Sequence, residues 1–204
     1  MEKFGQGFSY IWGQKVVLGA ITLDLFAVIL GGATALLPIF AQDILNVGSS
    51  GLGVLRSAPA LGAIVGSLIL IRFPITNHAG KIIFAGVFGF GLCIIVFALS
   101  PSMTLSLTAL VLAGSCDTIS VYVRAVLIQL WTPDDLRVRA NAINQLCVGG
   151  SNEIGAFQAG TLAAFITPTA TVLIGGIGAI AVASLWWSGF SQLRQINTLK
   201  GPQE

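Results

Sequence analysis

Charged residues are scarce in this sequence. Asp, Glu, Lys and Arg make up 9% of the 204 residues, whereas 55% of the residues are hydrophobic. A soluble domain has about 25% charged residues, so this chain has too little polar surface to cover a soluble globule. The mean hydropathy of +0.90 indicates instead a membrane protein that crosses the bilayer several times, because each spanning helix needs about 20 mostly apolar residues.

Other scarce residue types exclude several kinds of site. The single histidine, His78, lies in a predicted turn, so a buried Ser–His dyad has no base. The sequence has no Walker-type phosphate loop and no Gly-x-Gly-Asp motif. Cys93, Cys116 and Cys147 lack metal-binding or disulfide spacing, and we interpret them as small apolar residues in helix packing. We expect neither an enzyme nor a bound metal or cofactor, and the net charge of +2 argues against a nucleic-acid partner.

Polar turn segments divide the apolar sequence into six predicted membrane-spanning helices. These cover approximately Val16–Ile44, Leu52–Phe73, Lys81–Leu99, Thr104–Trp131, Arg139–Ile166 and Thr169–Phe190. We therefore expect an all-α polytopic membrane protein in three parts: a cytoplasmic or interfacial lead-in over 1–15, a six-helix domain over 16–190 and a cytoplasmic tail over 191–204.

Basic residues are confined to one side of this predicted topology. With the N-terminus in the cytoplasm, the cytoplasmic segments hold Lys3, Lys15, Arg72, Lys81, Arg137, Arg139, Arg194 and Lys200. The opposite side holds Asp43 and neither Lys nor Arg. Because cytoplasmic loops are enriched in Lys and Arg, we expect a multi-pass protein of the inner membrane with both termini in the cytoplasm.

Four charged residues lie close together between the fourth and fifth spans, in the stretch TPDDLRVRAN. They are Asp134, Asp135, Arg137 and Arg139. The stretch is a predicted cytoplasmic loop, and its arginines are expected to hold the flanking helices in their orientation.

Five ionisable residues fall inside the predicted spans, namely Asp24, Arg56, Asp117, Arg124 and Glu153. A charged side chain costs about 2.5–3.5 kcal/mol at the centre of a spanning helix, and such residues usually face the interior of a bundle or a watery cavity. By default, therefore, they are candidates for function.

Helical spacing separates these candidates. Asp117 and Arg124 share one face of the fourth span, but a rise of seven residues, about 10 Å, is too long for direct contact. Each of the two could simply pair with a charge on a neighbouring helix. Arg56 lies close to the outer boundary, where it could snorkel to the surface. Asp24 and Glu153 have no basic partner within their own helices, so they are the stronger candidates for loading and releasing a proton.

Three stretches resemble the second half of a major facilitator superfamily transporter. They are LGAITLDLFAVILGGATALLPIFAQDIL, GLGVLRSAPALGAIVGSL and TPDDLRVRANAINQLCVGGSNEIGAFQAG. The nearest branch is the enterobactin-exporter-like group, also called transmembrane secretion effectors, and the resemblance covers residues 11–190. It implies one six-helix half of the fold, built as a 3+3 inverted repeat, whose two halves move about a central cavity in alternating access.

The resemblance also implies function and partners. It implies proton-coupled export of a siderophore or drug-like small molecule across the lipid bilayer, with sodium as the alternative coupling ion. An N-terminal six-helix half, in the same or a separate chain, would complete the transporter. In such families the charged cluster between the fourth and fifth spans contacts helix ends and latches one state; the alternative is that it acts as a topology anchor only.

Two departures from the family pattern leave other functional interpretations open. Val138 stands where the loop pattern Pro-Asp-x-x-Arg-Gly-Arg has glycine, and the turn RFPITNHAGK has fewer arginines than expected. The chain could instead be a non-transporting truncated remnant, or a membrane interaction subunit that assembles with a separate half.

Overall fold

The computed structural model describes residues 10–197, and these residues contain helices and no strand. The long helices are α2 (Lys15–Leu30), α4 (Gly48–Arg72), α5 (Ala79–Ala98), α6 (Met103–Trp131), α7 (Asp134–Phe165) and α8 (Pro168–Gly189). Three short segments join α2 to α4, namely η1 (Ala33–Leu36), α3 (Leu37–Ile39) and η2 (Phe40–Ile44), and α9 (Ser191–Arg194) follows α8. The predicted all-helical class is confirmed.

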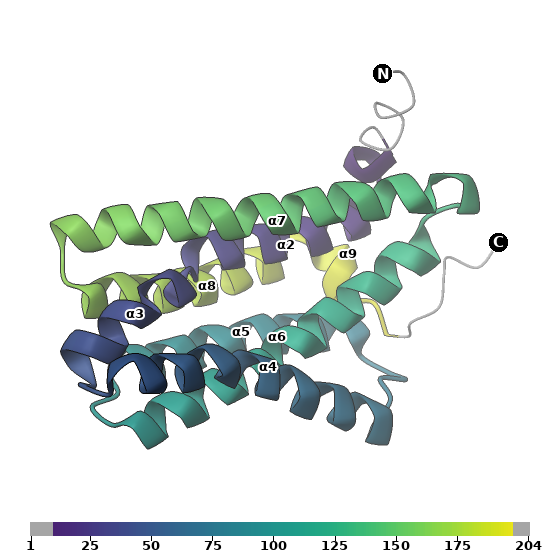
Figure 1. Cartoon of the computed structure of the whole chain (residues 1–204). Helices are drawn as coiled ribbons and strands as arrows, with labels where there is room; N and C mark the ends of the chain where they lie inside the picture. The colour runs from purple at the N-terminus through teal and green to yellow at the C-terminus, as the bar shows by residue number, and fades with distance from the viewer. Residues whose placement is uncertain (1–9, 198–204) are drawn as a thin grey trace.

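Five segments of the described chain are long and apolar enough to cross a membrane, judged by length and composition. They are residues 15–44, α4, α5, α6 and α8. The helix α7 has 32 residues but does not meet this criterion, because polar residues such as Asn141, Gln145, Asn152 and Glu153 interrupt its apolar sequence. It nevertheless runs from one end of the bundle to the other beside α2 (Figure 1).

The long helices pack in an arc, in the order α4, α6, α5, α8, α2 and α7 (Figure 1). The six helices form two sets, α2, α4 and α5 and then α6, α7 and α8. Each helix of one set has the same main packing neighbours as its counterpart in the other set, once the two sets are exchanged. Thus α4 packs on α6 as α7 packs on α2, and α5 packs on α6 as α8 packs on α2. Because α2 and α6 are three passes apart they run in opposite directions, as the predicted 3+3 inverted repeat requires.

The first predicted span is not one continuous helix, contrary to our expectation for Val16–Ile44. The helix α2 ends at Leu30, and the chain continues through the 3₁₀, α and π turns of η1, α3 and η2. The break falls at Gly31 and Gly32, and a Cβ at Gly32 would lie 2.5 Å from the carbonyl oxygen of Gly155 on α7. The close approach of the Gly32 and Gly155 backbones and the low helix propensity of glycine therefore interrupt the first span.

Small residues let α4 and α6 approach closely. A Cβ on Gly62 would collide with the carbonyl oxygen of Val111, and one on Gly114 with that of Pro59. The Ser115 hydroxyl also donates a hydrogen bond to the Gly62 carbonyl oxygen, at 2.8 Å. Such small-residue contacts hold helices together where apolar surroundings weaken the hydrophobic effect.

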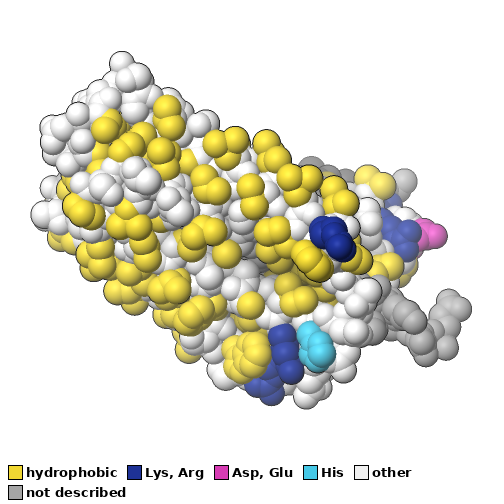
Figure 2. Space-filling model, turned by 90° about the horizontal axis from the view of Figure 1, so that it is seen from below, with side chains coloured by type: hydrophobic (Ala, Val, Ile, Leu, Met, Phe, Trp, Pro, Cys, Tyr) yellow, Lys and Arg dark blue, Asp and Glu magenta, His cyan; other side chains and the backbone are white. Residues whose placement is uncertain are grey.

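The two ends of the bundle differ in charge. The turn between α4 and α5, the turn between α6 and α7, and both ends of the described chain lie at one end (Figure 1). The described basic residues of these segments are Lys15, Arg72, Lys81, Arg137, Arg139 and Arg194. Figure 2 shows a face that is hydrophobic over most of its length, with its Lys and Arg side chains gathered towards one end. Lys3 and Lys200 lie outside the described residues.

The predicted lead-in and tail both contribute packed residues. Ile11 and Leu193 are buried in the apolar core of the bundle. Residues 1–9 of the lead-in and 198–204 of the tail lie outside the described residues.

Candidate functional site: charged residues inside the bundle

A buried ion pair joins the middle of α2 to the C-terminal third of α6. The Asp24 carboxylate contacts the Arg124 guanidinium, and the two residues are only 6% and 3% exposed. Asp24 has no basic partner within its own helix, as predicted, but Arg124 of α6 pairs with it. Spacing along a single helix cannot reveal a partner on another, and Arg124 reaches Asp24 from a helix that lies 100 positions later in the chain.

The surroundings of this ion pair are apolar. Leu23, Val123 and Leu127 are fully buried in the same core cluster. A low local dielectric strengthens the attraction between the charges, and removal of one partner would leave the other uncompensated. The pair thus ties together α2 and α6, the first helices of the two repeat sets, in a way that depends on both charges being present.

Asp117 lies elsewhere on α6, beside a cavity of about 160 Å³. It forms no ion pair within residues 10–197, in line with the predicted separation from Arg124. The cavity lies at the break in the first span, where Gly31, Gly32 and Thr34 line it. Asn152 of α7 also lines it. A carboxylate, an amide and the backbone of an interrupted helix are the groups with which transporters bind ions and polar substrates.

Glu153 and Arg56 are not part of this arrangement. Glu153 is exposed on α7 and does not line the Asp117 cavity. Arg56 is exposed on α4. The structure therefore brings Asp24 and Arg124 together and separates these two charges from Asp117, Glu153 and Arg56.

The charged cluster of residues 134–139 is helical, so the predicted loop is wrong in extent. Pro133 lies at the N-cap position, and α7 begins at Asp134 with Asp134 and Asp135 in its first turn. Proline stops the preceding helix, and carboxylates in a first turn are favoured by the helix dipole. Arg139 lies on the same helix, so the connection between α6 and α7 is only two residues long.

Arg137 links the C-terminal end of α6 to the N-terminal end of α7. Its Nε donates hydrogen bonds to the carbonyl oxygens of Gln129, at 2.8 Å, and Thr132, at 3.1 Å. Its guanidinium also pairs with Asp134 at 2.6 Å. The Tyr10 hydroxyl donates to the neighbouring Trp131 carbonyl oxygen, and burial raises the pKa of that hydroxyl above its ordinary value. The last carbonyls of α6 are thereby capped from two sides.

Residues 10–200 match the model of a protein family described as transmembrane secretion effector, of the MFS class. The chain belongs to this family. The predicted membership is thus confirmed, and the chain is a membrane protein.

Enterobactin exporters are among its curated relatives. The chain is 25% identical to the enterobactin exporter EntS of Salmonella choleraesuis strain SC-B67 over 188 residues, and 27% identical to EntS of Citrobacter koseri over 188 residues. It is 25% identical to EntS of Escherichia coli O1:K1 over 189 residues. These alignments cover 92–93% of this chain but 45% of each relative, so the chain spans about half the length of the curated relatives it matches.

Part of the cavity was not predicted from the sequence. Thr34 and Asn152 line it but were not among the predicted site residues. The Gly31–Gly32 pair was the available signal, because two adjacent glycines in an apolar run mark a position where a helix can break. Polar residues just beyond such a break are expected to line the opening.

Proposed function

We propose that this chain is one six-helix half of a secondary transporter that exports a siderophore or similar amphiphilic molecule by alternating access. The observation that carries the proposal is the Asp24–Arg124 ion pair, buried between α2 and α6. A cavity at the helix break, lined in part by Asp117 and Asn152, accompanies it. Ionisable residues are costly inside a membrane and usually mark ion or substrate pathways. The siderophore class is taken from relatives named as enterobactin exporters.

The proposed partner is an N-terminal six-helix half, in the same or a separate chain. Support comes from α7, whose exposed residues include Gln145, Gly149, Asn152 and Glu153. Lipid cannot satisfy amide and carboxylate groups, which usually face protein or a watery cavity. The second half would cover this face and leave a central space for the substrate. Positive-inside charge placement supports an inner-membrane protein with both termini in the cytoplasm.

Proton coupling is proposed to act through Asp24, with Glu153 as the second carboxylate. Protonation of Asp24 would remove the charge that holds Arg124, and the contact between α2 and α6 would weaken. A ligand shifts a two-state equilibrium only by binding the two states differently. A proton that binds Asp24 more strongly when Arg124 has moved away meets this condition.

The test is transport in the complete protein, with both halves present. Asp24→Asn and Glu153→Gln should each abolish pH-driven accumulation of enterobactin in inverted membrane vesicles. Glu153→Gln should not affect folding, whereas Asp24→Asn leaves Arg124 without its counter-charge, so circular dichroism is used to establish that this variant is folded. Asp43→Asn is the matched control, since Asp43 is an exposed carboxylate in η2. Normal transport by both carboxylate variants would refute the coupling role, whereas sodium-driven transport by the unsubstituted protein would replace protons by sodium.

A simpler experiment separates the three assembly alternatives. A tag at the C-terminus, expressed from the native locus, would reveal the mass of the membrane-bound product. A band at about twice 21.2 kDa indicates that both halves form one chain, as two six-helix halves require. A stable band at 21.2 kDa indicates an interaction subunit with a separate partner, and no stable product indicates a remnant.

A further inference from the structure

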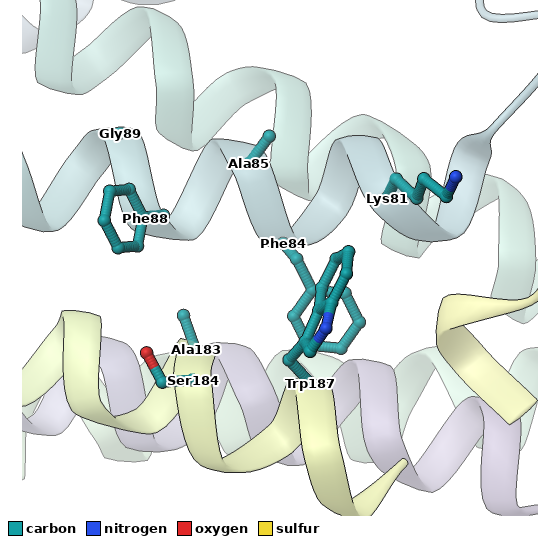
Figure 3. Close-up of a pocket in the computed structure, with 8 residues that line it drawn as sticks. All are labelled: Lys81, Phe84, Ala85, Phe88, Gly89, Ala183, Ser184 and Trp187. Carbon is teal, nitrogen blue, oxygen red and sulfur yellow. The ribbon is translucent and has the colours of Figure 1, made fainter. Parts of the chain in front are cut away.

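A lateral groove of about 470 Å³ runs between α5 and α8 (Figure 3). Its volume is typical of a small-molecule site. The side chains that line it come from the two helices, chiefly Phe84, Ala85 and Phe88 of α5 and Ala183, Ser184 and Trp187 of α8. The groove follows the direction of the helices, with Lys81 at one end (Figure 3).

The lining of the groove is suited to hydrocarbon. The rings of Phe84 and Trp187 meet edge to face, with centroids 5.4 Å apart, and both line the groove. Ala85 and Ala183 leave the space beside them open. The only hydroxyl in the lining, that of Ser184, already donates a hydrogen bond to the Ile180 carbonyl oxygen at 2.8 Å. The polar side-chain groups of the lining that remain for water or a polar ligand are the Lys81 ammonium and the Trp187 indole N–H.

Two cations lie at the same end of the groove. Lys81 is exposed in the first turn of α5. The Arg194 guanidinium lies 5.4 Å from the centre of the Trp187 ring and donates a hydrogen bond to the Trp187 carbonyl oxygen at 3.4 Å. Neither cation forms an ion pair with an acidic side chain in residues 10–197. This end thus presents uncompensated positive charge beside an apolar channel.

Backbone contacts hold these two cations near each other. The Gly80 amide donates to the Ile196 carbonyl oxygen at 3.0 Å. A side chain at position 80 would collide with the carbonyl oxygen of Leu193, so the start of α5 and the end of α9 are in direct contact. Their shared position is therefore a property of the fold rather than of two flexible side chains.

We propose that this groove binds an anionic phospholipid of the bilayer. One acyl chain lies between α5 and α8, and the phosphate lies at Lys81 and Arg194. Basic pockets between membrane helices bind anionic head groups, and each Lys or Arg near the surface contributes to this attraction. The apolar groove is what favours a lipid over a free phosphate, because a soluble anion makes no use of it.

The site does not compete with the proposed partner half. In the helix arc α5 packs between α6 and α8, and α8 packs between α5 and α2, whereas α4 and α7 form the two edges. The polar face of α7 is the proposed contact with the second half, so the groove between α5 and α8 stays open to lipid. Binding of lipid here therefore goes beyond export and does not depend on it.

The experiment is native mass spectrometry of the purified full chain in detergent, with equimolar phosphatidylglycerol and phosphatidylcholine added. The unsubstituted chain should retain phosphatidylglycerol in preference. Lys81→Gln and Arg194→Gln should each lower its retention about fivefold, the contribution of one cation near an anionic surface. Ala85→Phe should fill the groove and lower the retention of both lipids, and Ser184→Leu is a second filling variant if the first fails to fold.

Matched controls come from exposed positions outside the groove. Arg72→Gln removes an exposed cation on α4, and Ala181→Phe adds a ring on α8 at an exposed position outside the groove. Both should retain phosphatidylglycerol like the unsubstituted chain. Equal retention of the two lipids, full retention by Lys81→Gln and Arg194→Gln, or unchanged retention by both filling variants would overturn the proposal. Displacement of the lipid by inorganic phosphate would also overturn it.

Discussion

The neighbouring helices α6 and α7 place their polar residues in opposite ways. On α6, Arg124 and Ser115 are buried and bonded to other helices of the chain. On α7, Gln145, Asn152 and Glu153 are exposed. Both helices are long and carry charged residues in an apolar setting. The difference lies in whether the described chain supplies the partners.

This contrast distinguishes stability from assembly. Arg124 and Ser115 of α6 meet their partners on other helices of the chain, so they contribute to the fold of the half itself, whereas Asp117 lines the cavity. The exposed polar residues of α7 form a surface that suits polar groups from outside the described chain. Changes on α6 are therefore expected to affect folding, and changes on the outer face of α7 to affect transport or pairing.

The largest expected effect is at the buried pair. Arg124→Gln leaves the Asp24 carboxylate buried without a counter-charge, which should lower the free energy of unfolding by about 3–5 kcal/mol. Thermal unfolding of the detergent-solubilised chain, followed by circular dichroism, measures this loss. The double variant Asp24→Asn with Arg124→Gln should recover much of it, because both charges are then absent.

Arg56→Gln is the control for that experiment. Arg56 is exposed on α4, so its replacement should change the unfolding free energy by less than about 0.5 kcal/mol. A loss as large as that of Arg124→Gln, or a double variant as unstable as the sum of the two single variants, would show that the buried pair is not what stabilises α6.

A smaller effect is expected where the break in the first span meets α7. A Cβ at Gly32 would lie 2.5 Å from the Gly155 carbonyl oxygen, so Gly32→Ala forces the two backbones apart and should cost about 1–3 kcal/mol. Gly150→Ala on the exposed face of α7 meets nothing within 4 Å and should be neutral or stabilising, since alanine favours a helix. The same unfolding measurement compares the two. Equal destabilisation of the two variants would show that the close approach at Gly32 is not the cause.

The boundaries of most helices were predictable because they depend on local sequence. The fourth span was predicted over Thr104–Trp131 and the corresponding helix covers Met103–Trp131. Apolar length and turn residues suffice for such a boundary. The start of α7 was misplaced, since the charges at Asp134 and Asp135 were assigned to a loop although Pro133 followed by aspartates is also a helix start.

The contacts of the candidate site were less predictable. Composition pointed to Asp24 and Arg124 as costly residues, but their pairing depends on how α2 and α6 rotate against each other. That rotation is set by contacts spread over the whole bundle, such as the approach of Gly62 to α6. With a single sequence, the costly residues could be found and their partners could not.

The smallest stability effect is expected at the joint between α6 and α7. Arg137→Ala removes two hydrogen bonds to carbonyls at the end of α6 and the pairing with Asp134. The Arg137 side chain is 44% exposed, so solvent screening should limit the loss of unfolding free energy to about 0.5–1 kcal/mol, and Asp135→Ala is the exposed control.

The same connection between α6 and α7 discriminates the topology anchor from the latch. If Arg137→Glu and Arg139→Glu together invert the insertion of the chain, as cysteine labelling from each side would show, the cluster is an anchor. Because Arg137 bonds helix ends rather than lying free at the surface, we expect normal insertion with loss of transport, the result of a latch that holds α6 and α7 in one state.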